Sequence, residues 1–305
     1  MRKSPLSMFW DSPPALLTAT TLMWGCNAVA GQIAVGEISP VLMVLTRWVM
    51  VISVLWPMFG REVRAHWPQI RPRIGYIVAM AAIGFTGFNT LFYIASQYTS
   101  GVNIGILQGA IPAMVMIGAF VAYRSPVTPV QMVGVVVALC GAVVVSTGGD
   151  IDKLLALAIN RGDLIMLIAC LFYSFYTVGL QTRPNIPGKV LFTLLAVVAT
   201  VTAVPMVARE VVLGTFQWPT PTGWAVATFV AVFPSCLAQL TFMRGVDLIG
   251  PGRAGVYANL VPIFAALLAI VFLGQSFERF HALALLLVLG GIWMAQRTPR
   301  RRRSV

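Results

Sequence analysis

The stretch GVNIGILQGAIPAMVMIGAFVAY, residues 101–123, decides the fold because its pattern occurs a second time in the chain. It carries no charge and has the length of a membrane-crossing helix. Pro112 nevertheless lies at its middle, where proline removes a backbone hydrogen bond and kinks a continuous helix. A shift of 150 residues places Pro112 on Pro262, within GPGRAGVYANLVPIFAALLAIVFLG at 250–274. The proline is therefore a repeated feature.

The same shift aligns several further identical residues without a gap: Gly105 with Gly255, Phe92 with Phe242, Ala119 with Ala269, Val121 with Val271, and Gly141 with Gly291. Upstream, with one residue of slip, LMWGCNAV at 22–29 faces LFYSFYTV at 171–178. The pattern predicts one copy of a unit in residues 1–147 and a second copy in residues 161–297. A connector at 148–160 would join the two copies, and a basic tail would follow at 298–305.

The composition indicates a membrane protein. Of 305 residues, 58% are hydrophobic and only 10% are charged, whereas soluble domains carry about 25% charged residues. Ten apolar runs are long enough to span a bilayer; they fall at 14–35, 40–59, 74–96, 101–123, 128–147, 162–182, 189–208, 222–243, 253–273 and 279–296. We therefore expect an all-α integral membrane protein with ten transmembrane helices.

Lysine and arginine predict the orientation of these helices, because cytoplasmic loops are enriched in both. Sixteen of the 21 fall on the side of the termini, four fall on the other side, and Arg47 lies within a span. Both termini are therefore expected in the cytoplasm of a cell bounded by an inner membrane. Five spans per copy is an odd number, so the second copy must be inverted. Inverted repeats build secondary transporters whose site lies in a central cavity near the midplane.

The net charge of +12 could indicate nucleic-acid binding. The basic residues, however, lie in short clusters between apolar runs, and the one dense cluster is the final RTPRRRRSV at 297–305. We expect this tail to contact anionic lipid headgroups and not nucleic acid. No metal-binding or cofactor motif is present, so neither is expected, and a monomer is the simplest assembly.

The chain resembles the EamA domains of the drug/metabolite transporter superfamily. The resemblance rests on RGDLIMLIACLFYSFYTV at 161–178, on PVLMVLTRWVMV at 40–51, and on the two proline-centred helices. It implies a small-molecule carrier of the inner membrane, commonly an exporter. Where the family often has Gly-Glu before the last helix of a repeat, this chain has Gly274-Gln275 and Arg124-Ser125. Any role of those glutamates therefore cannot be carried over.

Arg47 is the clearest candidate for substrate binding, because charged residues inside spans are costly and commonly functional. In one interpretation its guanidinium holds a substrate carboxylate through two hydrogen bonds. In the other interpretation the side chain extends outward to the membrane surface or binds helix carbonyls.

Polar residues recur on one face of the third predicted span, at Asn89, Tyr93, Ser96 and Gln97. They would line a cavity or, alternatively, form hydrogen bonds between helices. Further candidates for substrate binding are Trp24, Asn27, Gln108, Tyr176, Gln239, Tyr257 and Asn259. His281 lies near the outer end of the last span. It could bind a proton, but we expect it to be a solvated interfacial residue. Pro112 and Pro262 are candidate gates, one in each copy.

Acidic residues are absent from the interior of the predicted spans, since Asp163, Asp247 and Glu278 lie at span ends. A buried cation without buried carboxylates favours zwitterionic or anionic substrates such as amino acids, and it leaves proton coupling without an evident carrier. A carrier for multidrug or cationic efflux is the alternative substrate class. The rival classes are a lipid-modifying membrane enzyme and a channel. The enzyme is disfavoured because no His, Asp and Ser constellation converges.

Overall fold

A computed structural model describes residues 5–150, 152 and 160–296. The tail at 298–305 and most of the connector at 148–160 lie outside these residues, so the expected lipid contact of the tail does too. Every regular element in the described part is helical. The α-helices are α1 (Pro5–Trp10), α2 (Pro13–Ile33), α3 (Pro40–Ala65), α4 (Trp67–Ile70), α5 (Ile74–Ala81), α6 (Phe88–Ala95), α7 (Gly101–Gln108), α8 (Ile111–Tyr123), α9 (Pro129–Thr147), α11 (Arg161–Gly179), α12 (Gly188–Val212), α13 (Pro221–Val230), α14 (Ala238–Ile249), α15 (Pro251–Tyr257), α16 (Val261–Leu273) and α17 (Arg279–Ala295).

Short segments of other helical geometry join several of these helices. The π-helical segment η2 (Ala82–Gly87) connects α5 to α6, and η4 (Ala231–Leu237) connects α13 to α14. The 3-10 turns are η1 (Arg71–Arg73), η3 (Leu180–Thr182) and η5 (Ala258–Leu260). The third predicted span of each copy, 74–96 and 222–243, is therefore a regular helix that one wide π-helical turn interrupts.

Eight helical stretches in the described part of the chain are long and apolar enough to cross a membrane, and several of them combine two or more of these helices. Two helices that the sequence predicts as spans fall outside this group. α17 is apolar but has only 17 residues, and α2 has 21 residues that include Asn27 and Gln32. The chain is thus an all-helical, multi-pass membrane protein.

The bounds of the helices repeat along the chain. α7 begins at Gly101 and α15 at Pro251, while α8 ends at Tyr123 and α16 at Leu273, so both pairs are 150 residues apart. The residue that follows α8 and the residue that follows α16 both have a left-handed backbone conformation, with φ of 53° at Arg124 and 62° at Gly274. The two halves therefore share local geometry at places where their sequences differ.

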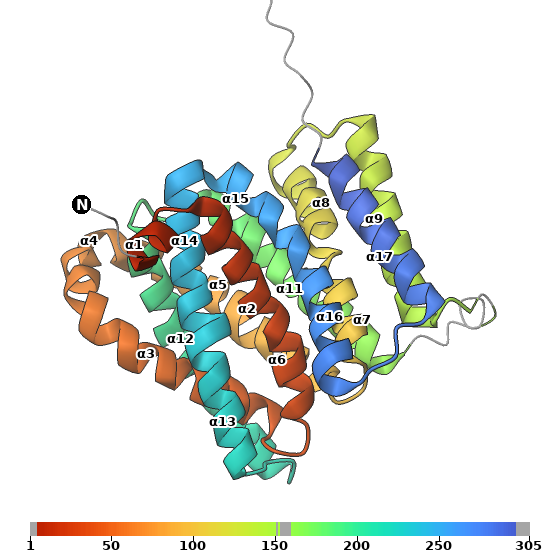
Figure 1. Ribbon diagram of the computed structural model, residues 1–305. Helices are drawn as coiled ribbons and strands as arrows, with labels where there is room; N and C mark the ends of the chain where they lie inside the picture. The colour runs from red at the N-terminus through yellow and green to blue at the C-terminus, as the bar shows by residue number, and fades with distance from the viewer. Residues whose placement is uncertain (1–4, 151, 153–159, 297–305) are drawn as a thin grey trace, which may run out of the picture.

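Helices from the two halves interleave. α9 packs along α17 at one edge of the bundle and α3 packs along α12, while α2 packs on α14 and α16, and α11 packs on α6 and α8 (Figure 1). Glycines bring α9 and α17 close together: a Cβ on Gly134 would lie 2.6 Å from the backbone nitrogen of Ala295. Such small residues let membrane helices approach closely.

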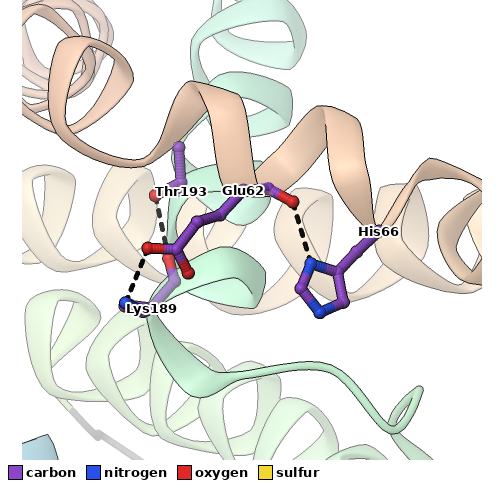
Figure 2. A network of polar contacts seen from close by, with 4 residues as sticks. All are labelled: Glu62, His66, Lys189 and Thr193. Atoms are coloured by element: carbon purple, nitrogen blue, oxygen red, sulfur yellow. Dashed lines mark hydrogen bonds and ion pairs between the residues drawn. The ribbon is translucent and has the colours of Figure 1, made fainter.

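The α3–α12 pair is also linked by polar contacts at its ends. Near the end of α3, Glu62 accepts a hydrogen bond from Lys189 Nζ at 2.7 Å, and His66 Nδ1 lies 2.8 Å from the carbonyl oxygen of Glu62 (Figure 2). At the other end of the pair, Glu210 of α12 accepts hydrogen bonds from Ser39 and Val41.

The two repeated prolines lie at breaks between helices and not within continuous helices. α7 ends at Gln108 and α8 begins at Ile111, which places Pro112 in the first turn of α8. Pro262 likewise lies in the first turn of α16, directly after η5. A proline is tolerated in a first turn, because its missing N–H would have no intrahelical partner there. The predicted span at 101–123 is confirmed as the helical stretch Gly101–Tyr123, with the break between α7 and α8 directly before Pro112.

Candidate functional site

Arg47 lies inside the helix bundle and is only 6% exposed. It donates from Nε to Ser235 Oγ at 2.6 Å, and from Nη1 to Asn89 Oδ1 at 2.6 Å and to Tyr93 Oη at 3.0 Å. All three acceptors are neutral, and within the described residues no carboxylate pairs with this guanidinium. The interpretation that Arg47 extends to the membrane surface or binds helix carbonyls is therefore wrong.

Further hydrogen bonds orient each acceptor of Arg47. Tyr93 donates its hydroxyl proton to Asn27 Oδ1 at 3.0 Å. Asn89 Nδ2 donates to the carbonyl of Phe85 at 2.6 Å, and this bond leaves Oδ1 facing the arginine. Ser235 donates to the carbonyl of Val230 at 2.6 Å and so accepts from Nε. Of the residues that the sequence singles out, Asn27, Arg47, Asn89 and Tyr93 thus converge in one cluster.

Both π-helical segments lie beside this cluster. η2 ends at Gly87, directly before the helix that carries Asn89, and η4 contains Ser235. A π turn widens the helix by one residue and is frequent at functional sites. Since Asn89 belongs to the first half and Ser235 to the second, Arg47 bridges the two halves. Ser235 is not among the residues predicted from the sequence, although Pro234 beside it disturbs the helix and is a usable signal.

An aromatic cluster covers one side of Arg47. The Arg47 Cζ atom lies 5.1 Å from the ring centroid of Trp48. The Trp48 ring in turn packs against Phe85 at 4.8 Å, and Phe85 against Tyr176 at 5.4 Å. Trp48 is 3% exposed, and its Nε1–H has no hydrogen-bond partner in the part of the chain that the structure describes. Tyr176 is among the residues that the sequence singles out, whereas Trp48 is not.

The remaining candidates for substrate binding do not hydrogen-bond to Arg47. Trp24 packs on Phe242 with ring centroids 5.2 Å apart, Gln108 donates to the carbonyl of Ile104 at 3.4 Å, and Asn259 exchanges amide contacts with Gln296. Gln239 and Tyr257 are half-buried. The cluster around Arg47 is accordingly smaller than the set of residues that the sequence proposed.

Two adjoining cavities lead toward the Arg47 cluster. The larger is an open cleft of about 800 Å³ at the distal end, by which we mean the end that holds the turns at 34–39, 96–100 and 274–278. The smaller is a narrow pocket beneath this distal cleft. Val35 and Gln97 line both cavities, and Tyr93 lines the narrow pocket. Tyr93 therefore lies between the narrow pocket, whose volume is about 10 Å³, and Arg47.

Two ionisable residues near the distal cleft are more buried than their positions at helix ends suggest. Asp163 in the first turn of α11 is 0% exposed, and His281 in the first turn of α17 is 5% exposed. The prediction that His281 is a solvated interfacial residue is therefore wrong. Within the described residues, no group of three His, Cys, Asp or Glu side chains could hold a metal ion.

Comparison with known families identifies the chain. The model of the EamA-like transporter family matches residues 14–147 and again residues 160–296. The chain belongs to the EamA-like transporter family. The resemblance noted in the sequence is thereby confirmed, and the chain is a membrane transporter and not an enzyme.

Similar EamA proteins occur in bacteria and archaea. The uncharacterized transporter YyaM of Bacillus subtilis is 28% identical over 237 residues, which cover 74% of each chain. The uncharacterized transporter YetK of the same organism is 23% identical and covers 91% of this chain and 84% of its own. A solved crystal structure covers 92% of this chain and 94% of its own with a TM-score of 0.64 and 18% identity, which indicates the same fold.

Proposed function

We propose that this EamA protein is a secondary transporter for a small zwitterionic or anionic metabolite, with amino acids as the leading class. The observation that carries the proposal is the buried Arg47, which neutral side chains hold in place and which no described carboxylate neutralises. A buried charge is costly unless it is paired. A carboxylate of the substrate would supply the missing counter-charge.

The geometry of the cluster suits such a substrate. A carboxylate can accept two parallel hydrogen bonds from a guanidinium, and it can replace neutral acceptors that bind the same nitrogens more weakly. The unpaired Nε1–H of Trp48 beside Arg47 offers another donor for a carboxylate oxygen. The rings of Trp48, Phe85 and Tyr176 offer an apolar surface to the rest of the molecule.

We further propose that transport proceeds by alternating access between two inverted five-helix repeats, with ten membrane spans in all. The repeated helix bounds, the two π-helical segments and the breaks before Pro112 and Pro262 support two equivalent units. The two separate matches to one family model also support them. The hinge at each break would let one half move against the other around Arg47, and both prolines would act as gates. Broken helices of this kind commonly flank transporter sites.

The orientation and direction of transport belong to the same proposal. The excess of lysine and arginine on the side of the termini supports cytoplasmic ends in an inner membrane. The distal cleft would then open to the outside, and export follows from the family resemblance. The basic tail would contact anionic lipids, and the protein would work as a monomer.

Transport by purified protein in liposomes tests the proposal. We expect one or more amino acids, from a radiolabelled panel that also holds nucleosides and organic cations, to exchange across the membrane. The substitution Arg47→Ala should lower substrate affinity by about 10- to 100-fold, since a hydrogen bond to a charged group contributes about 1.5–3 kcal/mol.

Two controls sharpen this test. Arg47→Lys keeps the charge but loses the paired geometry and should lie between the wild type and Arg47→Ala. Arg244→Ala changes a partly exposed arginine that contacts Asp11 at 3.6 Å and the Trp10 carbonyl, away from Arg47, and should leave transport unchanged. Unaltered amino-acid exchange by Arg47→Ala, or transport of organic cations alone, would overturn the proposed substrate class.

A further inference from the structure

A polar chain links three helices on the wall of the distal cleft. Asp163 of α11 accepts hydrogen bonds from the hydroxyl of Thr99 and from Asn103 Nδ2 of α7. Asn103 Nδ2 lies 3.3 Å from Oδ1 and 3.2 Å from Oδ2 of the carboxylate. Asn103 Oδ1 in turn lies 3.0 Å from His281 Nε2 of α17. Thr99, Asn103 and His281 line the distal cleft, whereas Asp163 is completely buried behind them.

The hydrogen bonds determine the protonation of His281. The backbone N–H of Glu278 donates to His281 Nδ1 at 2.9 Å, so Nδ1 is an acceptor without a proton. The neutral ring therefore carries its proton on Nε2 and donates it to Asn103 Oδ1. In the series of hydrogen bonds from His281 through Asn103 to Asp163, each donor then faces an acceptor, provided that Asp163 is ionised.

Among the described residues, no cation neutralises this ionised carboxylate. In the described residues no lysine or arginine forms an ion pair with Asp163. Arg161, two residues away, instead places its guanidinium over the ring of Tyr98 at 4.7 Å. The other titratable groups of the cleft wall are His281, Glu278 and Tyr98. A fully buried, unneutralised carboxylate is costly, and protonation removes that cost.

We propose that Asp163 is the proton-binding site that couples transport to the proton gradient, an inference that rests on the transport activity proposed above. One proton passes from water in the distal cleft to a carboxylate oxygen of Asp163, and the carboxylate becomes a neutral carboxylic acid. Thr99 lines the cleft and its hydroxyl donates to Asp163, so this side chain connects the carboxylate to the cleft wall.

The donors and acceptors explain how protonation is transmitted. A proton on Asp163 Oδ2 places an O–H donor opposite the Asn103 N–H group that lies 3.2 Å from this oxygen, whereas Oδ1 remains an acceptor. The Asn103 amide can satisfy the new donor by turning to present its oxygen. The turned amide then directs its N–H group at His281 Nε2–H, and two donors cannot bond. Protonation at α11 thereby releases the contact between α7 of the first half and α17 of the second. Such a two-state element is what coupling between sites requires.

Infrared difference spectroscopy tests proton binding without any substrate. The chain has only nine Asp and Glu residues, so a carbonyl band of a protonated carboxylic acid can be assigned by substitution. We expect acidification of the purified wild type in lipid to produce this band. The band should be lost in Asp163→Asn and retained in Asp152→Asn, which changes an exposed aspartate. Absence of the band in the wild type, or its persistence in Asp163→Asn, overturns the proposal.

Transport measurements separate this proposal from the proposed substrate class. With an amino acid that the wild type exchanges, Asp163→Asn should retain exchange but lose accumulation driven by a pH gradient. If transport by the wild type does not depend on the pH gradient, proton coupling is overturned, whereas the proposed substrate class is unaffected. Failure of every amino acid in the panel would overturn the substrate class, and the infrared band would still decide whether Asp163 binds a proton.

Discussion

At each end of the α3–α12 helix pair a glutamate of one helix binds the start of the other helix, but its partners differ between the two ends. Glu62 follows the first residue of α3 by 22 positions, and Glu210 follows the first residue of α12 by the same 22. Each glutamate contacts the start of the other helix. The partner of Glu62 is Lys189, and both side chains are about two-fifths exposed, at 39% and 43% (Figure 2). The partners of Glu210 are the Ser39 hydroxyl and the Val41 N–H, and Glu210 is 8% exposed.

This difference shows that burial and hydrogen bonding, more than a formal ion pair, set the strength of a helix contact. An exposed ion pair is screened by water and ions and contributes about 0–1 kcal/mol. A buried carboxylate at a helix N-terminus instead satisfies backbone donors that have no other partner, and it benefits from the helix dipole. We therefore expect the Glu210 contact to hold the pair more firmly than the Glu62 contact.

The largest effect is expected from Glu210→Ala. The substitution leaves the Ser39 hydroxyl and the Val41 N–H buried without their acceptor, which should lower the free energy of unfolding by about 1.5–3 kcal/mol. Thermal unfolding of the detergent-purified protein measures the loss. Glu210→Gln keeps one acceptor oxygen and should lose less. A loss for Glu210→Ala no greater than that for Glu62→Ala would break the comparison.

A smaller effect is expected from Ser39→Ala, which removes one of the two donors to Glu210. The loss should be about 1 kcal/mol, the usual contribution of a single hydrogen bond. Ser39→Thr retains the hydroxyl and serves as the control. In the Glu210→Ala background, Ser39→Ala should cost nothing further, because residues that share one contact are not additive. Additive losses in this double-substitution cycle would contradict a shared contact.

The smallest effect is expected from Glu62→Gln, with a loss of at most about 1 kcal/mol. Lys189→Met should match it, since either substitution removes the same ion pair. The loss should vanish at about 1 M salt, where the Debye length falls to about 3 Å. The loss caused by Glu210→Ala should not change with salt. A salt-independent loss for Glu62→Gln would show that this ion pair is not screened as its exposure implies.

Much of the fold could be predicted because hydropathy is a local property. The predicted runs at 101–123 and 253–273 coincide with the structural spans Gly101–Tyr123 and Arg253–Leu273. The interruption of both spans before their prolines was not predictable from hydropathy. A proline within an apolar run is compatible with a kink or with the first turn of a new helix, and only the backbone distinguishes these cases. The π-helical segments escaped prediction for the same reason.

The candidate site could be predicted only in part. The spacing of Asn89 and Tyr93 places both on one helix face, and both bind Arg47. Their partner Ser235 lies 188 residues from Arg47 in the chain, and no periodic pattern connects residues so far apart. Trp48 was missed because a tryptophan in an apolar run is ordinary, whereas its unpaired Nε1–H is visible only among its neighbours.

The membrane class, the approximate spans and the family could all be predicted from the sequence, since each follows from local hydropathy or from similarity along the chain. Which polar groups are buried, and what they contact, becomes known only from the three-dimensional packing of the helices. Asp163 and Glu210 lie at the ends of helices, where solvent exposure is the usual expectation, yet both are covered by elements of the other half. Burial depends on packing between distant segments, and such packing is absent from any local pattern.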